Sequence, residues 1–128
     1  ESYNSNPLSL KSALKNFDMI EVDNSKKHLV LGDMLELGKY SKQLHLEIGK
    51  SINKTSLKNI NVIGEHVNWI FNNLNRSKRG IVIKKKSQII DLIKNNLNNN
   101  DYLMIKGSNS TGLNSLTNQI KTGKINAI

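Results

Sequence analysis

The 128-residue sequence contains no cysteine and a single proline, and aromatic residues make up only 5% of it. Without cysteine the chain can form neither disulfides nor a thiol-based active site. No apolar run approaches the roughly 20 residues that a membrane-spanning helix needs, and the first residues lack the layout of a signal peptide. We therefore expect a cytoplasmic globular protein that does not associate with membranes.

Arginine is scarce as well. Of the 19 lysines and arginines only Arg76 and Arg79 are arginine, although the formal net charge is +9. Such a charge favours nucleic-acid binding through counterion release. Recognition of bases and phosphates, however, relies strongly on arginine, and a genome biased toward AT-rich codons would also enrich lysine, asparagine and isoleucine. We expect no nucleic-acid partner and keep a basic nucleic-acid-binding domain as an alternative.

Several catalytic signatures are also missing. Residues 106–108 (Lys-Gly-Ser) do not have the order of a P-loop, and no second glycine lies at the required upstream spacing. There is no G-x-S-x-G nucleophile elbow. The three histidines, His28, His45 and His66, do not have metal-ligand spacing. We therefore expect no catalytic residue and no metal site in this chain.

Four short apolar runs have the pattern of buried parallel strands, at residues 28–31, 61–64, 80–83 and 102–105. Apolar residues recur at helical spacing over residues 9–17, 41–52, 66–74, 87–97 and 113–120. Ser41 and Ser87 are placed to cap the second and fourth of these helices. The alternation predicts an α/β fold with three layers, in which helices cover a mostly parallel sheet.

The chain has no internal repeat or linker, so we expect one domain over residues 1–128. Its polar opening turn, residues 1–7, leads straight into the first helix. An alternating fold would place a strand before such a turn. We therefore expect that the first strand is missing through truncation and that the chain is a fragment of a longer protein.

Ligands of open parallel sheets bind beyond the carboxyl ends of the strands, and polar residues follow each predicted strand. These residues are Tyr3, Asn4 and Asn6 in the opening turn, Asp33 and Glu36, Glu65 and His66, Lys84 to Lys86, and Lys106 and Ser108. Carboxylates can hold an amine, and a lysine with backbone N–H groups can hold a carboxylate. The pattern indicates a site for a small zwitterion. Lys84 to Lys86 alone is more typical of a solvated run.

Three segments together resemble one family. Residues 3–10 (YNSNPLSL) are similar to its Y-N-A-N-P-x-S-M motif, residues 31–38 (LGDMLELG) with Ser41, His45 and Gly49 to its L-G-D-M-x-E-L-G…S…H…G segment, and residues 105–108 (IKGS) to its V-K-G-S motif. The family is that of the UDP-N-acetylmuramoyl-tripeptide–D-alanyl-D-alanine ligases, a branch of the Mur ligases. The resemblance runs over nearly the whole chain.

The resemblance implies the Rossmann-like C-terminal domain of a three-domain ligase. ATP phosphorylates the terminal carboxylate of UDP-N-acetylmuramoyl-tripeptide, and the amine of D-alanyl-D-alanine attacks the resulting acyl phosphate. The P-loop and the Mg²⁺ ligands belong to a central domain, so this chain alone is expected to be inactive. Its partners would be these substrates and its own N-terminal and central domains.

The same resemblance assigns roles to particular residues. Glu1, where the family has Asp, and Tyr3 would contact the nucleotide. The expected substrate-binding residues are Asn4, Asn6, Asp33, Glu36, Lys106 and Ser108. Other interpretations of these residues remain open: asparagines that stabilise a turn, carboxylates that cap a helix, and a lysine at a solvated strand end. His45 is expected to be structural. A flavodoxin-like signalling module is a further alternative for the whole chain.

Overall fold

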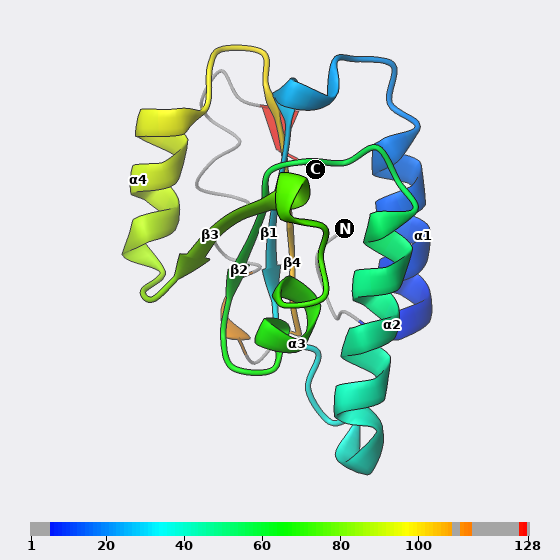
Figure 1. Cartoon of the computed structure of the whole chain (residues 1–128). Coiled ribbons are helices and arrows are strands. Elements are labelled where there is room, and N and C mark those ends of the chain that lie inside the picture. The colour runs from blue at the N-terminus through cyan, green and yellow to red at the C-terminus, as the bar shows by residue number, and fades with distance from the viewer. Residues whose placement is uncertain (1–5, 109–110, 114–125, 128) are drawn as a thin grey trace.

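The computed structural model describes residues 6–108, 111–113 and 126–127. Five parallel strands form one sheet in the order β3-β2-β1-β4-β5 (Figure 1). The strands are β1 (Lys27–Gly32), β2 (Ile60–Ile63), β3 (Arg79–Ile83), β4 (Tyr102–Lys106) and β5 (Asn126–Ala127). This order matches the Rossmann fold, whereas flavodoxin-like sheets have the order 2-1-3-4-5. The α/β prediction is confirmed, and the flavodoxin-like alternative is wrong.

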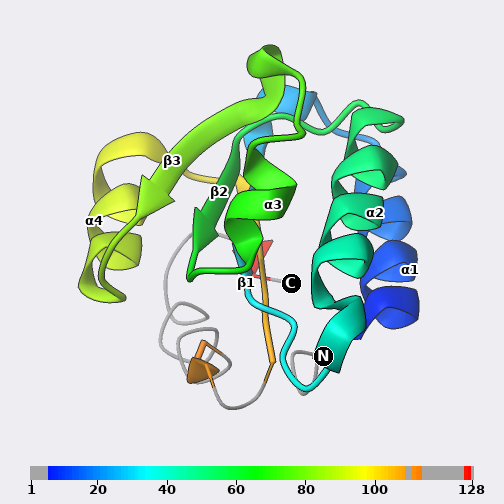
Figure 2. The same cartoon turned by 60° about the horizontal axis from the view of Figure 1, so that its bottom comes forward.

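Helices cover both faces of the sheet. Helices α1 (Pro7–Asp18), α2 (Ser41–Asn53) and α3 (Val67–Phe71) lie on one face, and α4 (Ser87–Asn96) lies on the other (Figures 1 and 2). Short 3-10 turns occupy Asn24–Lys26, Gly38–Tyr40 and Arg76–Lys78. The helices begin at the end of the molecule where the strands end, and Figure 2 turns this end toward the viewer. We call it the carboxyl rim.

The core divides along the central strand. All six residues of β1 are buried. Leu29 and Leu31 pack with the helices α1, α2 and α3, whereas Val30 packs with α4. Successive side chains of a strand point to opposite faces. A strand that is covered on both faces therefore needs a continuous apolar run, which is the pattern that predicts it.

Helix α1 starts at a cap that the sequence makes recognisable. Asn6 Oδ1 accepts a hydrogen bond of 2.9 Å from the N–H of Ser9, and Pro7 occupies the first turn. An asparagine cap satisfies an otherwise unpaired helical N–H, and proline lacks an N–H that would need a partner there. The cap fixes Asn6 at the carboxyl rim.

Two predicted caps are wrong. Neither Ser41 nor Ser87 caps its helix with its side chain. At the start of α4, Gln88 Oε1 instead accepts hydrogen bonds from the N–H groups of Lys84 and Lys85. The Ser41 hydroxyl faces another partner, described below. The long glutamine side chain thus reaches back to the turn that precedes the helix.

Helix α3 is shorter than the predicted helix at residues 66–74. It ends at Phe71, where side chains take backbone carbonyls both within the helix and beyond it. Asn73 Nδ2 donates to the carbonyl of Trp69 at 2.9 Å, and the Arg79 guanidinium donates to that of Leu74 at 3.1 Å. Leu74 is nevertheless buried in the core. Of the helix predicted at 113–120, only position 113 lies within the described residues.

A buried asparagine disturbs the pairing of β2 with β3. Asn61 is 3% exposed, and its Nδ2 donates to the carbonyl of Leu29 at 2.9 Å. Its Oδ1 accepts from the N–H of Ile81 at 2.9 Å, in place of a bond between the two strands. The register of the strands shifts at this position. A Cβ at Gly80 would collide with Asn61 Oδ1, so the close approach requires glycine there.

Three of the cations serve the fold itself. Lys27 Nζ donates to the last carbonyl of α1, at 2.8 Å. Lys78 Nζ donates to two carbonyls in the chain that follows α2, at 2.6 and 2.9 Å. Arg79 donates to two carbonyls after α3. A cation near a helix C-terminus neutralises the negative end of the helix dipole. Part of the positive charge is therefore explained without a nucleic-acid partner.

Candidate functional site

The carboxyl ends of β1 and β4 lie side by side at the rim, with Leu31 opposite Lys106 in register. After β1 the chain turns toward α2 on one face of the sheet, whereas Leu113, after β4, packs in the core on the α4 face. Neighbouring strands whose chains diverge in this way form a topological switch point, where open α/β sheets bind ligands. The loops after β1 and β4 therefore form the candidate site.

Two glycines let these strand ends approach each other. A Cβ on Gly107 would lie 3.3 Å from Gly32 Cα and 2.9 Å from Leu113 Cδ1. A Cβ on Gly32 would collide with the same Leu113 methyl group. The Leu113 side chain thus packs against both glycines, and a side chain at either position would displace it.

The loop after β1, residues 33–38, is the rim loop. It is tied to the end of β4 by two hydrogen bonds that involve Ser108. The Ser108 N–H donates to the carbonyl of Asp33 at 3.1 Å, and the Ser108 hydroxyl accepts from the N–H of Leu35 at 2.8 Å. Ser108 is buried, so it joins the two motif segments from below the surface. A hydroxyl that accepts one hydrogen bond can still donate its own hydrogen to a ligand.

The Asp33 carboxylate holds the start of α3. Its two oxygens accept from the N–H groups of Val67, at 2.8 Å, and Glu65, at 3.1 Å. Gly64 lies against it with a φ of +130°, and a Cβ there would come within 2.7 Å of Asp33 Oδ1. Carboxylates are favourable at helix N-termini. This geometry matches the helix-related alternative for Asp33, and its role in ligand binding stays a prediction.

Glu36 and Lys106 bring opposite charges to the rim. Glu36 is exposed, and its φ of 62° lies in the left-handed region, which costs a non-glycine residue about 1–2 kcal/mol. Gly38, with a φ of 57°, makes the second left-handed turn of the rim loop. Strained residues of this kind cluster in ligand-binding loops. Lys106, the last residue of β4, is half-buried.

The other predicted site residues divide into three groups. Asn6 lies at the rim as the cap of α1, whereas Glu1, Tyr3 and Asn4 lie outside the described residues. Glu65 is exposed beside Asp33. The Lys84 to Lys86 run is exposed at the start of α4, as expected of a solvated run. The structure therefore brings Asn6, the rim loop and the Lys106–Ser108 segment to one end of the molecule.

A cluster of two histidines and a tryptophan, from α2 and the start of α3, packs beside the rim loop. The ring of His45, on α2, lies 5.6 Å from that of His66 and 5.9 Å from that of Trp69. The Ser41 hydroxyl lies 2.9 Å from His66 Nδ1. His45 itself is completely buried and contacts the backbone of Met34 in the rim loop. The four-residue spacing of Ser41 and His45 is the local signal that could have identified this cluster.

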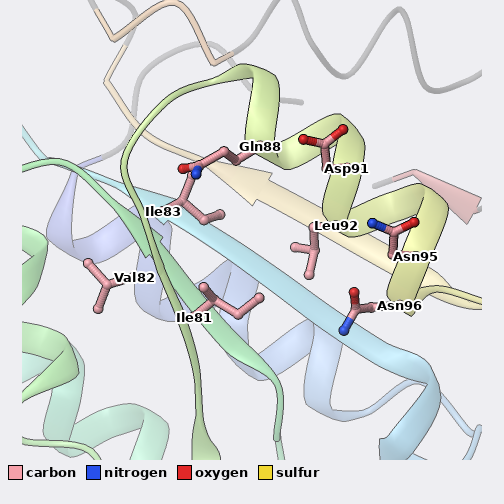
Figure 3. Close-up of a pocket in the computed structure, with 8 residues that line it drawn as sticks. All are labelled: Ile81, Val82, Ile83, Gln88, Asp91, Leu92, Asn95 and Asn96. Atoms are coloured by element: carbon pink, nitrogen blue, oxygen red, sulfur yellow. The ribbon is translucent and has the colours of Figure 1, made fainter.

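Two cavities lie away from these residues. One, of about 230 Å³, lies between the edge strand β3 and α4, where Ile81 and Leu92 face it beside the polar Gln88 and Asp91 (Figure 3). A second, of about 320 Å³, adjoins it and is lined in part by His28. Among the predicted substrate-binding residues that the structure describes, none lines either cavity. Neither cavity therefore belongs to the candidate site.

The residues that the structure describes do not fit a complete site for ATP and Mg²⁺. They contain no group of three or more His, Asp or Glu side chains that could hold a metal ion, and the sequence has no P-loop. Within the same part of the chain, no helix has both the length and the apolar character needed to cross a bilayer.

Comparison with known proteins gives a consistent family. The family described as Mur ligase, glutamate ligase domain matches residues 2–109. Curated relatives named UDP-N-acetylmuramoyl-tripeptide–D-alanyl-D-alanine ligase, from Buchnera aphidicola, Bacillus subtilis and Rickettsia prowazekii, are 34%, 30% and 29% identical to the chain. The matches cover 87%, 84% and 87% of the chain but 24% of each relative. The chain thus spans about a quarter of their length.

Solved structures share the fold. The MurF ligase from Thermotoga maritima in complex with ADP has a TM-score of 0.71 at 20% identity, covering 94% of this chain and 27% of that one. MurF from Acinetobacter baumannii has a TM-score of 0.72 at 22% identity, covering 95% of this chain and 26% of that one. Both similarities extend over nearly all of the sheet and its helices.

Proposed function

The chain belongs to the Mur ligase family, as its glutamate ligase domain, and from this premise we propose that it is the C-terminal domain of a UDP-N-acetylmuramoyl-tripeptide–D-alanyl-D-alanine ligase. The observation that carries the proposal is the meeting of the motif segments at the switch point, where the Ser108 bonds join the rim loop to the end of β4. The relatives of this name support the choice of this branch of the family.

The charges at the rim suit a dipeptide zwitterion. Lys106 would pair with the carboxylate of D-alanyl-D-alanine, because an ammonium group forms strong charge-assisted hydrogen bonds with carboxylates. Glu36 would face the amine end of the dipeptide. Asn6 Oδ1 accepts the hydrogen bond that caps α1. The amide N–H groups of the same side chain can donate to a substrate carbonyl.

The contribution of this domain is to position the nucleophile. The dipeptide amine attacks the acyl phosphate made from the tripeptide carboxylate and ATP; the new C–N bond forms, the C–O bond to phosphate breaks, and phosphate and the amine proton leave. Holding two reacting groups in the right geometry can lower a barrier by roughly 7–11 kcal/mol. The rim loop is suited to this task because its backbone N–H groups bond to His45 of α2 and to Ser108 after β4, and the Asp33 side chain bonds to the start of α3. No proton transfer is assigned to a residue of this chain.

ATP, Mg²⁺ and the UDP-linked tripeptide would be held mainly by the N-terminal and central domains of the full-length enzyme. A complex with ADP is known for the Thermotoga maritima relative. Glu1 and Tyr3 are the residues of this chain that we assign to the nucleotide, which supplies the phosphoryl group that activates the carboxylate. We place the enzyme in the cytoplasm, where the substrates of this reaction would be available.

Replacement of Lys106 by alanine in the full-length enzyme tests the proposal. Loss of one hydrogen bond to a charged group should raise the KM for D-alanyl-D-alanine roughly ten- to hundredfold. The KM for ATP should change little, because the nucleotide is bound elsewhere. Steady-state kinetics with each substrate varied in turn would measure both constants.

Lys84→Ala is the matched control. Lys84 is an exposed lysine that follows β3 at the same rim, so its removal changes the net charge equally. We expect a nearly normal KM for the dipeptide in this variant. An unchanged dipeptide KM in Lys106→Ala would remove Lys106 from the site, and equal increases in the two variants would attribute the effect to the general charge of the rim.

A further inference from the structure

The ring of His45 has both nitrogens engaged by backbone groups. Nδ1 lies 2.7 Å from the carbonyl oxygen of Ser41, and Nε2 lies 3.2 Å from the nitrogen of Met34. A carbonyl can only accept, so Nδ1 carries the hydrogen, and a backbone N–H can only donate, so Nε2 is the acceptor. The partners therefore fix one tautomer of the neutral ring.

The surroundings of His45 favour this neutral form. The ring is 0% exposed, and burial lowers the pKa of His45 below its usual value; the bond to the Ser41 carbonyl and the nearby Asp33 carboxylate oppose this shift, and His66 adds to it. The groups that face the ring are Ser41 on its own helix, Asp33 and Met34 in the rim loop, and, from the neighbouring helix, Trp69 in α3 with His66 just before it.

Three consecutive residues of the rim loop are anchored, each in a different way. Asp33 binds the start of α3, Met34 binds His45, and Leu35 binds Ser108. Of these anchors, only an imidazole changes its charge between pH 5 and 8 when it is unperturbed. Protonation of Nε2 would place two donors, the ring N–H and the Met34 N–H, against each other and break the bond.

We propose that His45 is a positioning residue that holds the rim loop through Met34, and that protonation of its ring releases the loop. The effect on dipeptide binding rests on the proposed function, because the same loop carries Glu36 and is joined to the Lys106–Ser108 segment. When the ring is neutral the loop is fixed for the substrate, and when the ring is protonated the loop loosens.

Hydrogen exchange at the Met34 amide tests the inference without any substrate. In the 128-residue chain, NMR should find the His45 ring in the Nδ1–H tautomer at pH 7.5. The Met34 protection factor, which corrects for the pH dependence of exchange, should fall about tenfold in His45→Ala, the loss expected when one hydrogen bond is removed. It should also fall in the unmodified chain as the pH is lowered through the titration of His45.

Two further variants separate loss of the His45–Met34 hydrogen bond from general destabilisation of the chain. His45→Gln keeps a neutral side chain with an oxygen that can accept a hydrogen bond from the Met34 N–H. The protection factor of the Met34 amide should therefore be largely retained in this variant and should not depend on pH. His28→Gln removes a second buried histidine, which bonds Asp101 at the opposite end of β1, and should leave the pH dependence at Met34 unchanged. Met34 protection that is equal in the unmodified chain and in His45→Ala at pH 7.5 would overturn the inference, as would a pH dependence that persists in His45→Gln.

Kinetics of the full-length enzyme then separate this inference from the proposed function. The KM for D-alanyl-D-alanine should rise in acid more in the unmodified enzyme than in His45→Gln, and comparison at equal pH cancels the titration of the dipeptide amine. If Met34 protection responds to His45 as described while the dipeptide KM does not, the positioning of the loop by His45 stands and the assignment of the loop to the dipeptide fails.

Discussion

At position 61 an asparagine occupies the interior of the sheet, where a strand covered on both faces ordinarily carries an apolar side chain. Its amide satisfies backbone groups on both neighbouring strands. Burial of a polar group is favourable only when its hydrogen bonds are made. Asn61 meets this condition. Its bond to the N–H of Ile81 also replaces a backbone hydrogen bond between β2 and β3 that is missing where their register shifts.

Asn61→Ala should therefore destabilise the chain by roughly 2–4 kcal/mol, because the Leu29 carbonyl and the Ile81 N–H both lose a buried partner. Urea denaturation followed by circular dichroism would measure the change. Asn96→Ala, at an exposed position at the end of α4, is the control and should remain within about 0.5 kcal/mol of the original stability. Equal urea midpoints for the two variants would refute this account of the shifted register.

Such partnerships also mark the limit of what single residues reveal in the sequence. The position of Asp33 after the first strand predicts that it lies at the rim, and it does. Its partners Glu65 and Val67 are 32 and 34 residues away, and no local pattern encodes contacts over that separation. The sequence therefore indicates the end of the sheet at which Asp33 lies but not that its carboxylate is engaged by the start of α3.

At the scale of elements, buried lysine side chains bond to the backbone carbonyls at or after the ends of helices. Lys78 is 7% exposed, and burial lowers the pKa of its ammonium group. Its donors reach the carbonyls of Thr55 and Leu57, in the segment that links α2 to β2. The cost of burying this cation is offset by charge-assisted hydrogen bonds to backbone groups that would otherwise lack a partner.

Lys78→Met keeps the aliphatic part of the side chain and removes its donors. The variant should lose roughly 1–3 kcal/mol of unfolding free energy, since two carbonyls lose a charged partner. Lys58→Met serves as the control, because Lys58 is an exposed lysine of the same segment. Thermal unfolding of both variants would measure the difference, and a Lys78→Met chain as stable as the control would show that water replaces the ammonium group at no cost.

The strands were the most predictable elements. Each of the four predicted strands is present, and each predicted boundary lies within one residue of the observed one. Burial on both faces leaves a continuous apolar run that is readily recognised. The two-residue strand β5 has no such run, and α3 is cut short by the side chains of Asn73 and Arg79. Helical spacing predicts which residues face the core but not where polar neighbours end the helix.

At the scale of the whole molecule, we expect the chain to provide one part of a site. The sequence has no P-loop, and the described residues hold no metal-binding cluster. The isolated 128-residue chain should therefore show neither ATP hydrolysis nor amide formation when it is assayed with ATP, Mg²⁺ and both substrates. Turnover above that of a buffer control would contradict the assignment to a substrate-positioning domain.

The edge formed by β3 also matters when many copies of the chain share a solution. In the sheet that the structure describes, β3 is an edge strand, and its Ile81 is 46% exposed; an edge of this kind invites a strand from another molecule. The shifted register at Asn61 makes the edge strand β3 irregular. Arg79 and Lys84 place positive charge at the two ends of β3. A second copy of the chain that paired its own β3 with this strand would face an irregular edge with the same positive charges. We therefore expect the asparagine that shifts the register of β2 and β3 to disfavour aggregation as well.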